Sequence, residues 1–146
     1  MGAGIAKTIF AQFPEALAAD KATAYRDKSK FGTISTASIE IANTKFVVVN
    51  AYTQFHWKGR GRKADFDAIS ACFDRVAEDF SSMRIGYLAI GAGLAGGDWI
   101  TIGPRISTAL VGRDCSIPDD HIDPRRSALF MARSILNEVR DGRSAC

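Results

Sequence analysis

A glycine-rich loop between an apolar stretch and an amphipathic one constrains the fold of this chain more than any other feature. Residues 85–90 form a short apolar run, which predicts a strand, and a stretch of helical periodicity starts near Asp98. Four glycines lie between them: Gly91, Gly93, Gly96 and Gly97. Strand, glycine loop and helix in this order are typical of α/β proteins, which bind ligands beyond the carboxyl ends of their strands.

The rest of the chain also alternates between the two periodicities. The pattern predicts helices over 4–13, from Pro14 towards Tyr25, and over 65–80, and strands over 37–41 and 46–49, with a turn at Asn43-Thr44. A helix from Asp98 buries Trp99, Ile102, Ile106 and Leu110. The order strand, helix, strand, loop, helix implies parallel strands with right-handed crossovers. After an irregular stretch, Asp123-Pro124 predicts a last helix with an apolar side of Leu129, Ala132, Leu136 and Val139.

Composition narrows the class of protein. The 146 residues fit one domain, and the hydrophobic fraction of 47% is that of an ordinary globular protein. No apolar run approaches the ~20 residues of a membrane helix, and no secretory signal is evident, so we expect a cytoplasmic protein without a membrane partner. The spacing of Cys72, Cys115 and Cys146, and of His56 and His121, indicates neither a disulfide framework nor a metal site.

The net charge of +3 has one local concentration, four positive charges within residues 58–63. Such a run can bind phosphate groups of a nucleotide or of a nucleic-acid backbone. A solvated loop is the simpler interpretation of the charges alone, and few aromatic residues are interleaved with them. Nucleic-acid binding therefore ranks last among the functions we consider.

The glycine loop has a chemistry of its own. Glycines accept positive φ and let a ligand approach the main chain, and the helix that follows offers unpaired N–H groups and the positive end of its dipole. Together they suit a phosphate or diphosphate. Gly91, Gly93 and Gly96 match G-x-G-x-x-G, but no Walker lysine follows. On the glycines alone, a tight turn without a ligand is an equal interpretation.

Two further segments add to this loop: Met1-Gly2-Ala3-Gly4-Ile5-Ala6, which again leads into a helix, and Val49-Asn50-Ala51-Tyr52-Thr53-Gln54. With Ile90–Trp99 they resemble the ligand loops and central strand of the macro domain, the ADP-ribose-binding and ADP-ribose 1″-phosphate processing family. The resemblance is to phage and bacterial members and to the branch of terminal ADP-ribose protein glycohydrolase. It implies a single three-layer α-β-α domain with a mixed sheet, truncated or altered at both ends. Residues 1–110 would form the family-like core, and 111–146 an atypical C-terminal segment with a helix.

The resemblance also implies a ligand and the residues that hold it. Family members bind ADP-ribose without a cofactor, and some hydrolyse ADP-ribosyl linkages or ADP-ribose 1″-phosphate. The residues implied to line the distal ribose are Gly2, Ala3, Gly4 and Ile5. Those implied to wrap the diphosphate and distal ribose are Gly91, Ala92, Gly93, Leu94, Ala95 and Gly96. Asn50 and Gln54 would reach the pocket from the end of the strand.

Three departures from the family pattern qualify the resemblance. Relatives close with a strand directly after the helix that ends here near Leu110, whereas this chain has an irregular stretch and an extra helix. The chain begins inside the first ligand loop, so the family's adenine-binding aspartate and its asparagine near the ribose have no counterpart. Tyr52 or Thr53 stands where the glycohydrolase branch has a lysine, and Ala95 where it has an aspartate. Asp98 is the remaining acidic candidate: it would either activate a water or, as its position favours, cap its own helix. An ADP-ribosyl hydrolase, an ADP-ribose 1″-phosphate phosphatase, a non-catalytic binding module and a degenerate fragment therefore remain alternatives.

Overall fold

A computed structural model describes residues 5–24, 27–54, 60–92, 95–116 and 129–134. Its helices are α1 (Ile5–Gln12), α2 (Pro14–Lys21), the short 3-10 helix η1 (Lys28–Lys30), α3 (Phe66–Asp79) and α4 (Trp99–Ala109). Its strands are β1 (Ile34–Ile41), β2 (Thr44–Tyr52), β3 (Ile85–Gly86), β4 (Cys115–Ser116) and β5 (Leu129–Ser134). The four predicted helices up to residue 110 are confirmed. No helix in the described ranges is both long enough and apolar enough to cross a bilayer.

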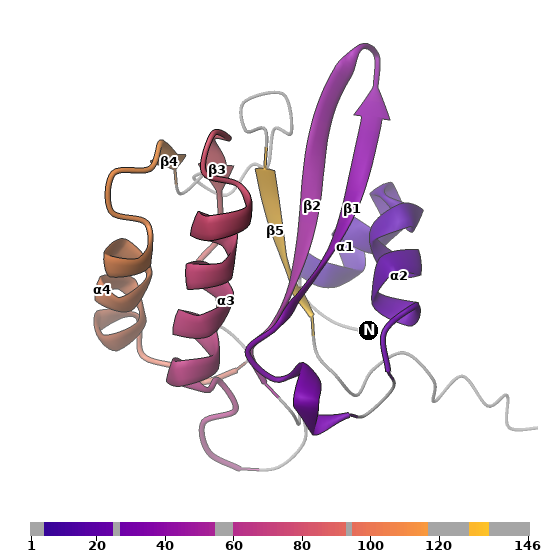
Figure 1. The fold of residues 1–146 in the computed structure, drawn as a ribbon. Coiled ribbons are helices and arrows are strands. Elements are labelled where there is room, and N and C mark those ends of the chain that lie inside the picture. Colours follow the sequence, from indigo (N-terminus) through magenta and orange to yellow (C-terminus); the bar gives the residue numbers. More distant parts are fainter. Residues whose placement is uncertain (1–4, 25–26, 55–59, 93–94, 117–128, 135–146) are drawn as a thin grey trace, which may run out of the picture.

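The strands form one mixed sheet in the order β1-β2-β5-β3-β4 (Figure 1). β1 and β2 are an antiparallel hairpin, and β2, β5, β3 and β4 run parallel to one another. The mixed α/β class is therefore confirmed. The expected parallel relation of β2 and β3 holds as well, although β5 lies between them.

The hairpin turn lies one residue earlier than the sequence predicts. Its two central residues are Ala42 and Asn43, with φ of 48° and 65°, and Thr44 is already the first residue of β2. Positive φ at both central positions is the twist that two-residue hairpins require, and asparagine tolerates it well.

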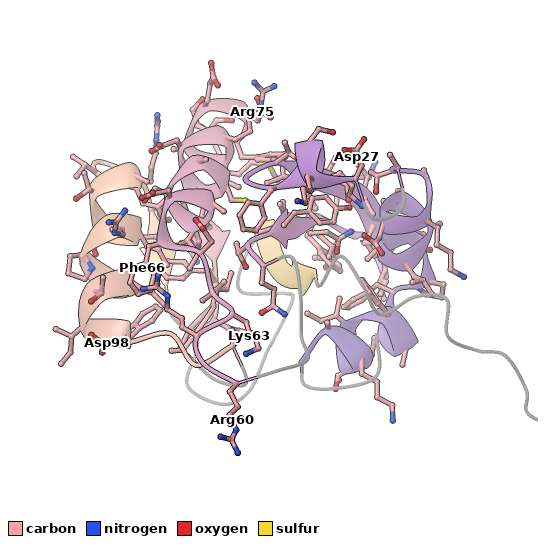
Figure 2. The ribbon with its side chains drawn as sticks, turned by 90° about the horizontal axis from the view of Figure 1, so that it is seen from below. Asp27, Arg60, Lys63, Phe66, Arg75 and Asp98 are labelled. Carbon is pink, nitrogen blue, oxygen red and sulfur yellow. The ribbon has the colours of Figure 1, made fainter. Side chains whose placement is uncertain are left out.

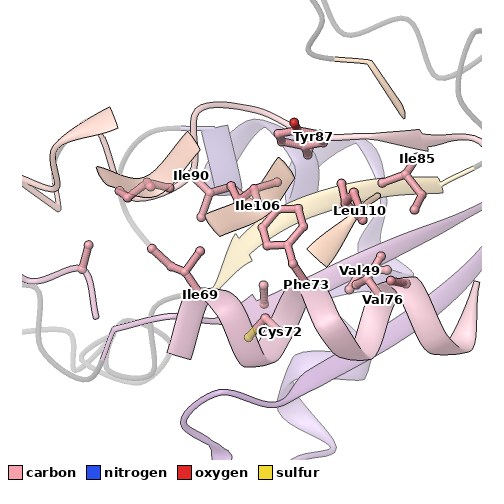
Figure 3. Close-up of a cluster of buried hydrophobic side chains, with 14 of the residues drawn as sticks. Val49, Ile69, Cys72, Phe73, Val76, Ile85, Tyr87, Ile90, Ile106 and Leu110 are labelled. Atoms are coloured by element: carbon pink, nitrogen blue, oxygen red, sulfur yellow. The ribbon is translucent and has the colours of Figure 1, made fainter. Parts of the chain in front are cut away.

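Helices α3 and α4 pack on one face of the sheet. Ile69, Phe73 and Val76 of α3, spaced three and four residues apart on one side of the helix, are fully buried there. Phe73 meets Tyr87 edge to face with ring centroids 5.3 Å apart. Figure 3 shows this cluster, to which β2 contributes Val49. Its cohesion comes from apolar area removed from water, the dominant favourable contribution to folding.

Helices α1 and α2 cover the other face. Phe13, at the junction of the two helices, packs edge to face on Phe46 of β2 with ring centroids 5.3 Å apart. Pro14 occupies the first turn of α2, where its missing N–H costs nothing. Because Phe46 and Val48 point to this face and Val49 to the other, β2 is buried on both sides.

Two predictions are wrong. The strand expected over 85–90 is only Ile85–Gly86, and residues 87–90 leave the sheet before the glycine loop. The helix expected after Asp123 is not a helix at 129–134, because this segment is β5. An apolar run this short suits either structure, and pairing with β2 on one side and β3 on the other decides for the strand. Leu136 and Val139 lie outside the described residues.

Candidate functional site

The glycine loop, the end of β2 and the starts of α3 and α4 come together at one edge of the sheet. Figure 2 views the molecule from this end, where Arg60, Lys63, Phe66 and Asp98 lie. The convergence follows from topology, because helices that return from parallel strands begin at the edge where those strands end.

A short backbone ladder holds these parts together. The Thr53 carbonyl, just after β2, accepts the N–H of Asp65 at 3.0 Å. The Ala95 carbonyl in the glycine loop accepts the N–H groups of Lys63 at 2.7 Å and of Ala64 at 3.1 Å. Residues 63–65 therefore bridge the end of β2 and the glycine loop.

Two glycines of the loop are required by packing. The Gly97 N–H donates to the Gly91 carbonyl at 2.8 Å, and a Cβ on Gly97 would lie 2.6 Å from that oxygen. A Cβ on Gly91, whose φ is +83°, would lie 3.1 Å from Ile69 and Ile102 side-chain carbons. These glycines are explained by the turn itself, without reference to a ligand.

Gly96 differs from them. Its φ is +63°, yet the nearest atom to an added Cβ, Cα of Arg62, is 3.7 Å away. Gly96 is exposed and Ala92 is half-buried, so these two residues of the loop present surface to a ligand.

The other members of the predicted second loop are less available. Ala95 is 1% exposed and its carbonyl already accepts two N–H groups. Gly91 is buried. Gly93 and Leu94 lie outside the described residues, as do Gly2, Ala3 and Gly4 of the first loop. Ile5 is the first residue of α1.

Asp98 caps α4. One of its carboxylate oxygens accepts the N–H of Ile100 at 3.1 Å, and the other accepts the hydroxyl of Thr101 at 3.0 Å. Asp65 caps α3 in the same way through the N–H of Ala68 at 2.8 Å. The cap favoured for Asp98 is confirmed, and its catalytic role stays a prediction. The expectation that the α4 N-terminus binds a phosphate needs correction, because a carboxylate already occupies it.

Asn50 and Gln54, predicted to reach the pocket, are both buried. The Asn50 amide nitrogen donates to the carbonyl of Ala16 at 2.9 Å and to the hydroxyl of Ser35 at 3.1 Å. It therefore ties β2 to α2 and β1 rather than to the glycine loop. Gln54 follows Thr53 and so stays at the edge where the glycine loop lies.

The sequence did not predict a buried polar network that lies near Asn50. The Tyr52 hydroxyl donates to Asp20 at 2.9 Å and lies 2.9 Å from the Ser35 hydroxyl. The Lys30 ammonium lies 3.8 Å from the Asp20 carboxylate and 4.0 Å from the Tyr52 ring centre. Burial raises the pKa of Tyr52 to about 12 and lowers the pKa of Lys30. No local pattern pairs these residues, which come from four separate elements: α2, η1, β1 and β2.

Positive charge gathers beside the glycine loop. The Arg62 guanidinium lies 4.0 Å from the centre of the Phe66 ring, and the Lys63 ammonium donates to the carbonyls of Arg60 and Gly61 at 2.8 and 2.7 Å. The lysine thus fixes the turn, while Arg60 and Arg62 leave their charge on the surface.

Elsewhere, a hollow of about 330 Å³ opens against the β1–β2 hairpin and Met83, and none of the predicted site residues lines it. No group of side chains suited to a metal ion occurs in the described part of the chain, and His56, His121 and Cys146 lie outside that part.

Comparisons with protein-family models, curated proteins and solved structures found no match to this chain.

Proposed function

We propose that this chain binds ADP-ribose or a close derivative, at the edge formed by the glycine loop, residues 60–65 and the end of β2. The main support is that the Ala95 carbonyl accepts two backbone N–H groups, those of Lys63 and Ala64. These bonds hold the glycine loop against the basic segment, residues 60–63. Three segments that resemble macro-domain ligand loops and central strand suggest the ligand. On the same grounds we propose that the helices on both faces of the mixed sheet form the three-layer macro-domain arrangement.

The charges favour a diphosphate ligand held by the loop rather than by a helix end. Because Asp65 and Asp98 cap α3 and α4, the helix dipoles are already offset at this edge. Arg60 and Arg62 supply positive charge, and the main chain at Ala92 and Gly96 allows close approach.

Calorimetric titration with ADP-ribose tests the proposal, with AMP and ribose 5-phosphate as controls. ADP-ribose should bind well above either fragment. Ala92→Glu places a negative charge beside the proposed diphosphate and should abolish binding, whereas Ser82→Glu, exposed in the turn after α3, makes the same charge change and should not. A folded protein that gives no heat with ADP-ribose would refute the proposal.

Hydrolysis is a separate proposition that depends on Asp98. Asp98→Asn keeps a good helix cap but removes the ionised carboxylate. If Asp98 activates a water, this variant should bind ADP-ribose normally and lose turnover of ADP-ribosylated protein or of ADP-ribose 1″-phosphate. If wild-type protein binds ADP-ribose but consumes neither substrate, the chain is a non-catalytic binding module.

The basic segment also keeps nucleic-acid binding as a second candidate. That function predicts affinity for DNA or RNA that falls steeply with salt. Arg62 covers the Phe66 ring, so the aromatic face nearest the basic segment is already in contact with a guanidinium. Binding that is absent or insensitive to salt would eliminate this candidate.

A further inference from the structure

Thr53 carries a buried hydroxyl without a partner. The residue is 1% exposed, and its Oγ has no hydrogen-bond partner among the residues the structure describes. A buried hydroxyl that loses water and gains no bond lowers the stability of the folded state. Such groups are rare in native proteins, so each calls for an explanation.

The position of Thr53 supplies one. Its carbonyl is bound by Asp65, and the two residues before Asp65 are bound by Ala95 of the glycine loop. The Thr53 hydroxyl therefore belongs to a residue at the proposed ligand edge, one bridging segment away from the glycine loop. The buried polar side chains before it in β2 differ in this respect, because the Tyr52 hydroxyl and the Asn50 amide nitrogen both have hydrogen-bond partners.

The surrounding charge defines the kind of partner. The bridging segment continues from Arg60 and Arg62, which are exposed and positively charged, and the nearby carboxylates of Asp65 and Asp98 accept bonds within their own helices. A hydroxyl at an edge that carries positive charge is suited to donate to an anionic oxygen.

We propose that the Thr53 hydroxyl donates a hydrogen bond to a phosphate oxygen of the ligand bound at the glycine loop. This inference rests on the proposed function. Since Thr53 is 1% exposed, this hydrogen bond needs a local rearrangement, so binding and that rearrangement are coupled.

Thr53→Val has nearly the same shape and removes only the hydroxyl. It should raise the melting temperature of the free protein by a few degrees, because an unsatisfied group is lost, and weaken ligand binding about tenfold. Thr53→Ser keeps a hydroxyl and should bind like wild type. Thr23→Val is the matched control. The Thr23 hydroxyl donates to the Asp20 carbonyl at 2.6 Å, so this variant should lose stability and keep its affinity.

The experiment combines thermal unfolding with calorimetric titration by ADP-ribose and by inorganic pyrophosphate. Weaker binding by a more stable Thr53→Val supports the inference. If Thr53→Val binds with unchanged affinity, the inference is overturned and the proposed function stays intact. A fall in the melting temperature of Thr53→Val has the same consequence, because it would show that the hydroxyl is bonded in the folded protein. If wild type binds pyrophosphate but not ADP-ribose, the proposed function fails, and the pyrophosphate affinities of the two Thr53 variants decide the inference. If it binds neither, both fail.

Discussion

The two faces of the sheet are built differently, although β2 contributes to both. The face under α3 and α4 carries a cluster of fifteen buried residues, all hydrophobic, among the residues the structure describes. In the described part of the chain, the face under α1 and α2 carries eight. Beyond Val48 its apolar packing gives way to the network of Asn50, Tyr52 and Asp20. The stability of the face under α3 and α4 therefore depends on close apolar packing, whereas that of the face under α1 and α2 depends on hydrogen bonds as well.

Substitutions should therefore destabilise the two faces for different reasons. An apolar cluster loses stability in proportion to the volume removed, and neighbouring side chains relax only in part. A buried network fails when one member leaves its partners unsatisfied, even if the volume is unchanged. The proposed ligand edge lies where the first kind of packing ends, at the glycine loop.

The largest expected effect is on the apolar face. Phe73→Ala removes a fully buried ring in contact with Tyr87 and should lower the free energy of unfolding by about 3–5 kcal/mol. Urea denaturation followed by circular dichroism measures it. A loss below about 1 kcal/mol would mean that the cluster collapses around the gap, contrary to close packing.

On the polar face, Asp20→Ala should cost about 2–3 kcal/mol, because it leaves the Lys30 ammonium and the Tyr52 hydroxyl without this acceptor. Asp20→Asn keeps an acceptor for Tyr52 and should lose less. Urea denaturation of both variants distinguishes hydrogen bonding from charge. If both variants lose the same stability, the whole effect comes from removing the carboxylate charge beside Lys30.

A smaller effect appears only at alkaline pH. The folded pKa of Tyr52, about 12, lies above its ordinary value of 10.0, so the folded protein holds this proton more tightly. The stabilisation is complete below about pH 10 and is lost as the pH rises towards 12. Burial also raises the pKa of Cys72 to about 12, which adds a loss from pH 9 upward, whereas the lowered pKa of Lys30 acts in the opposite direction.

Tyr52→Phe separates the tyrosine from these other groups. The stability difference between wild type and variant, measured by urea denaturation, should shrink between pH 9 and pH 11.5, because only the Tyr52 contribution differs between them. A constant difference would show that Tyr52 titrates as it does in the unfolded chain.

The weakest destabilisation is expected at the proposed ligand edge. Asp98→Ala removes the α4 cap and should lower the free energy of unfolding by about 1 kcal/mol, while Asp98→Asn should change it by only a few tenths. The same pair at Asp65, which caps α3, is the control. Equal losses for Asp98→Ala and Asp98→Asn would show that the charge, rather than the side-chain acceptor, stabilises this end.

Local features of the sequence were sufficient to predict the four α-helices up to residue 110 and the two strands of the hairpin. The stripe of Ile69, Phe73 and Val76 required a helix, because residues at that spacing share one side only in a helix. Asp98 lies directly before an amphipathic stretch, and this position alone favoured a helix N-cap. The alternation around Ala37 and Ile39 likewise required a strand, since that period matches no helix.

The pairing of strands and of buried polar groups depends on long-range contacts. Residues 129–134 suit a helix or a strand until β2 and β3 offer backbone partners on both sides. Asn50 was expected at the ligand, but its amide bonds to Ala16 and Ser35, which adjoin it only when α2 and β1 fold against β2. The unpartnered hydroxyl of Thr53 is of the same kind, because burial and the lack of a partner are properties of the packed chain. Periodicity and capping act within a few residues, whereas these contacts join segments far apart in sequence, so no local pattern encodes them.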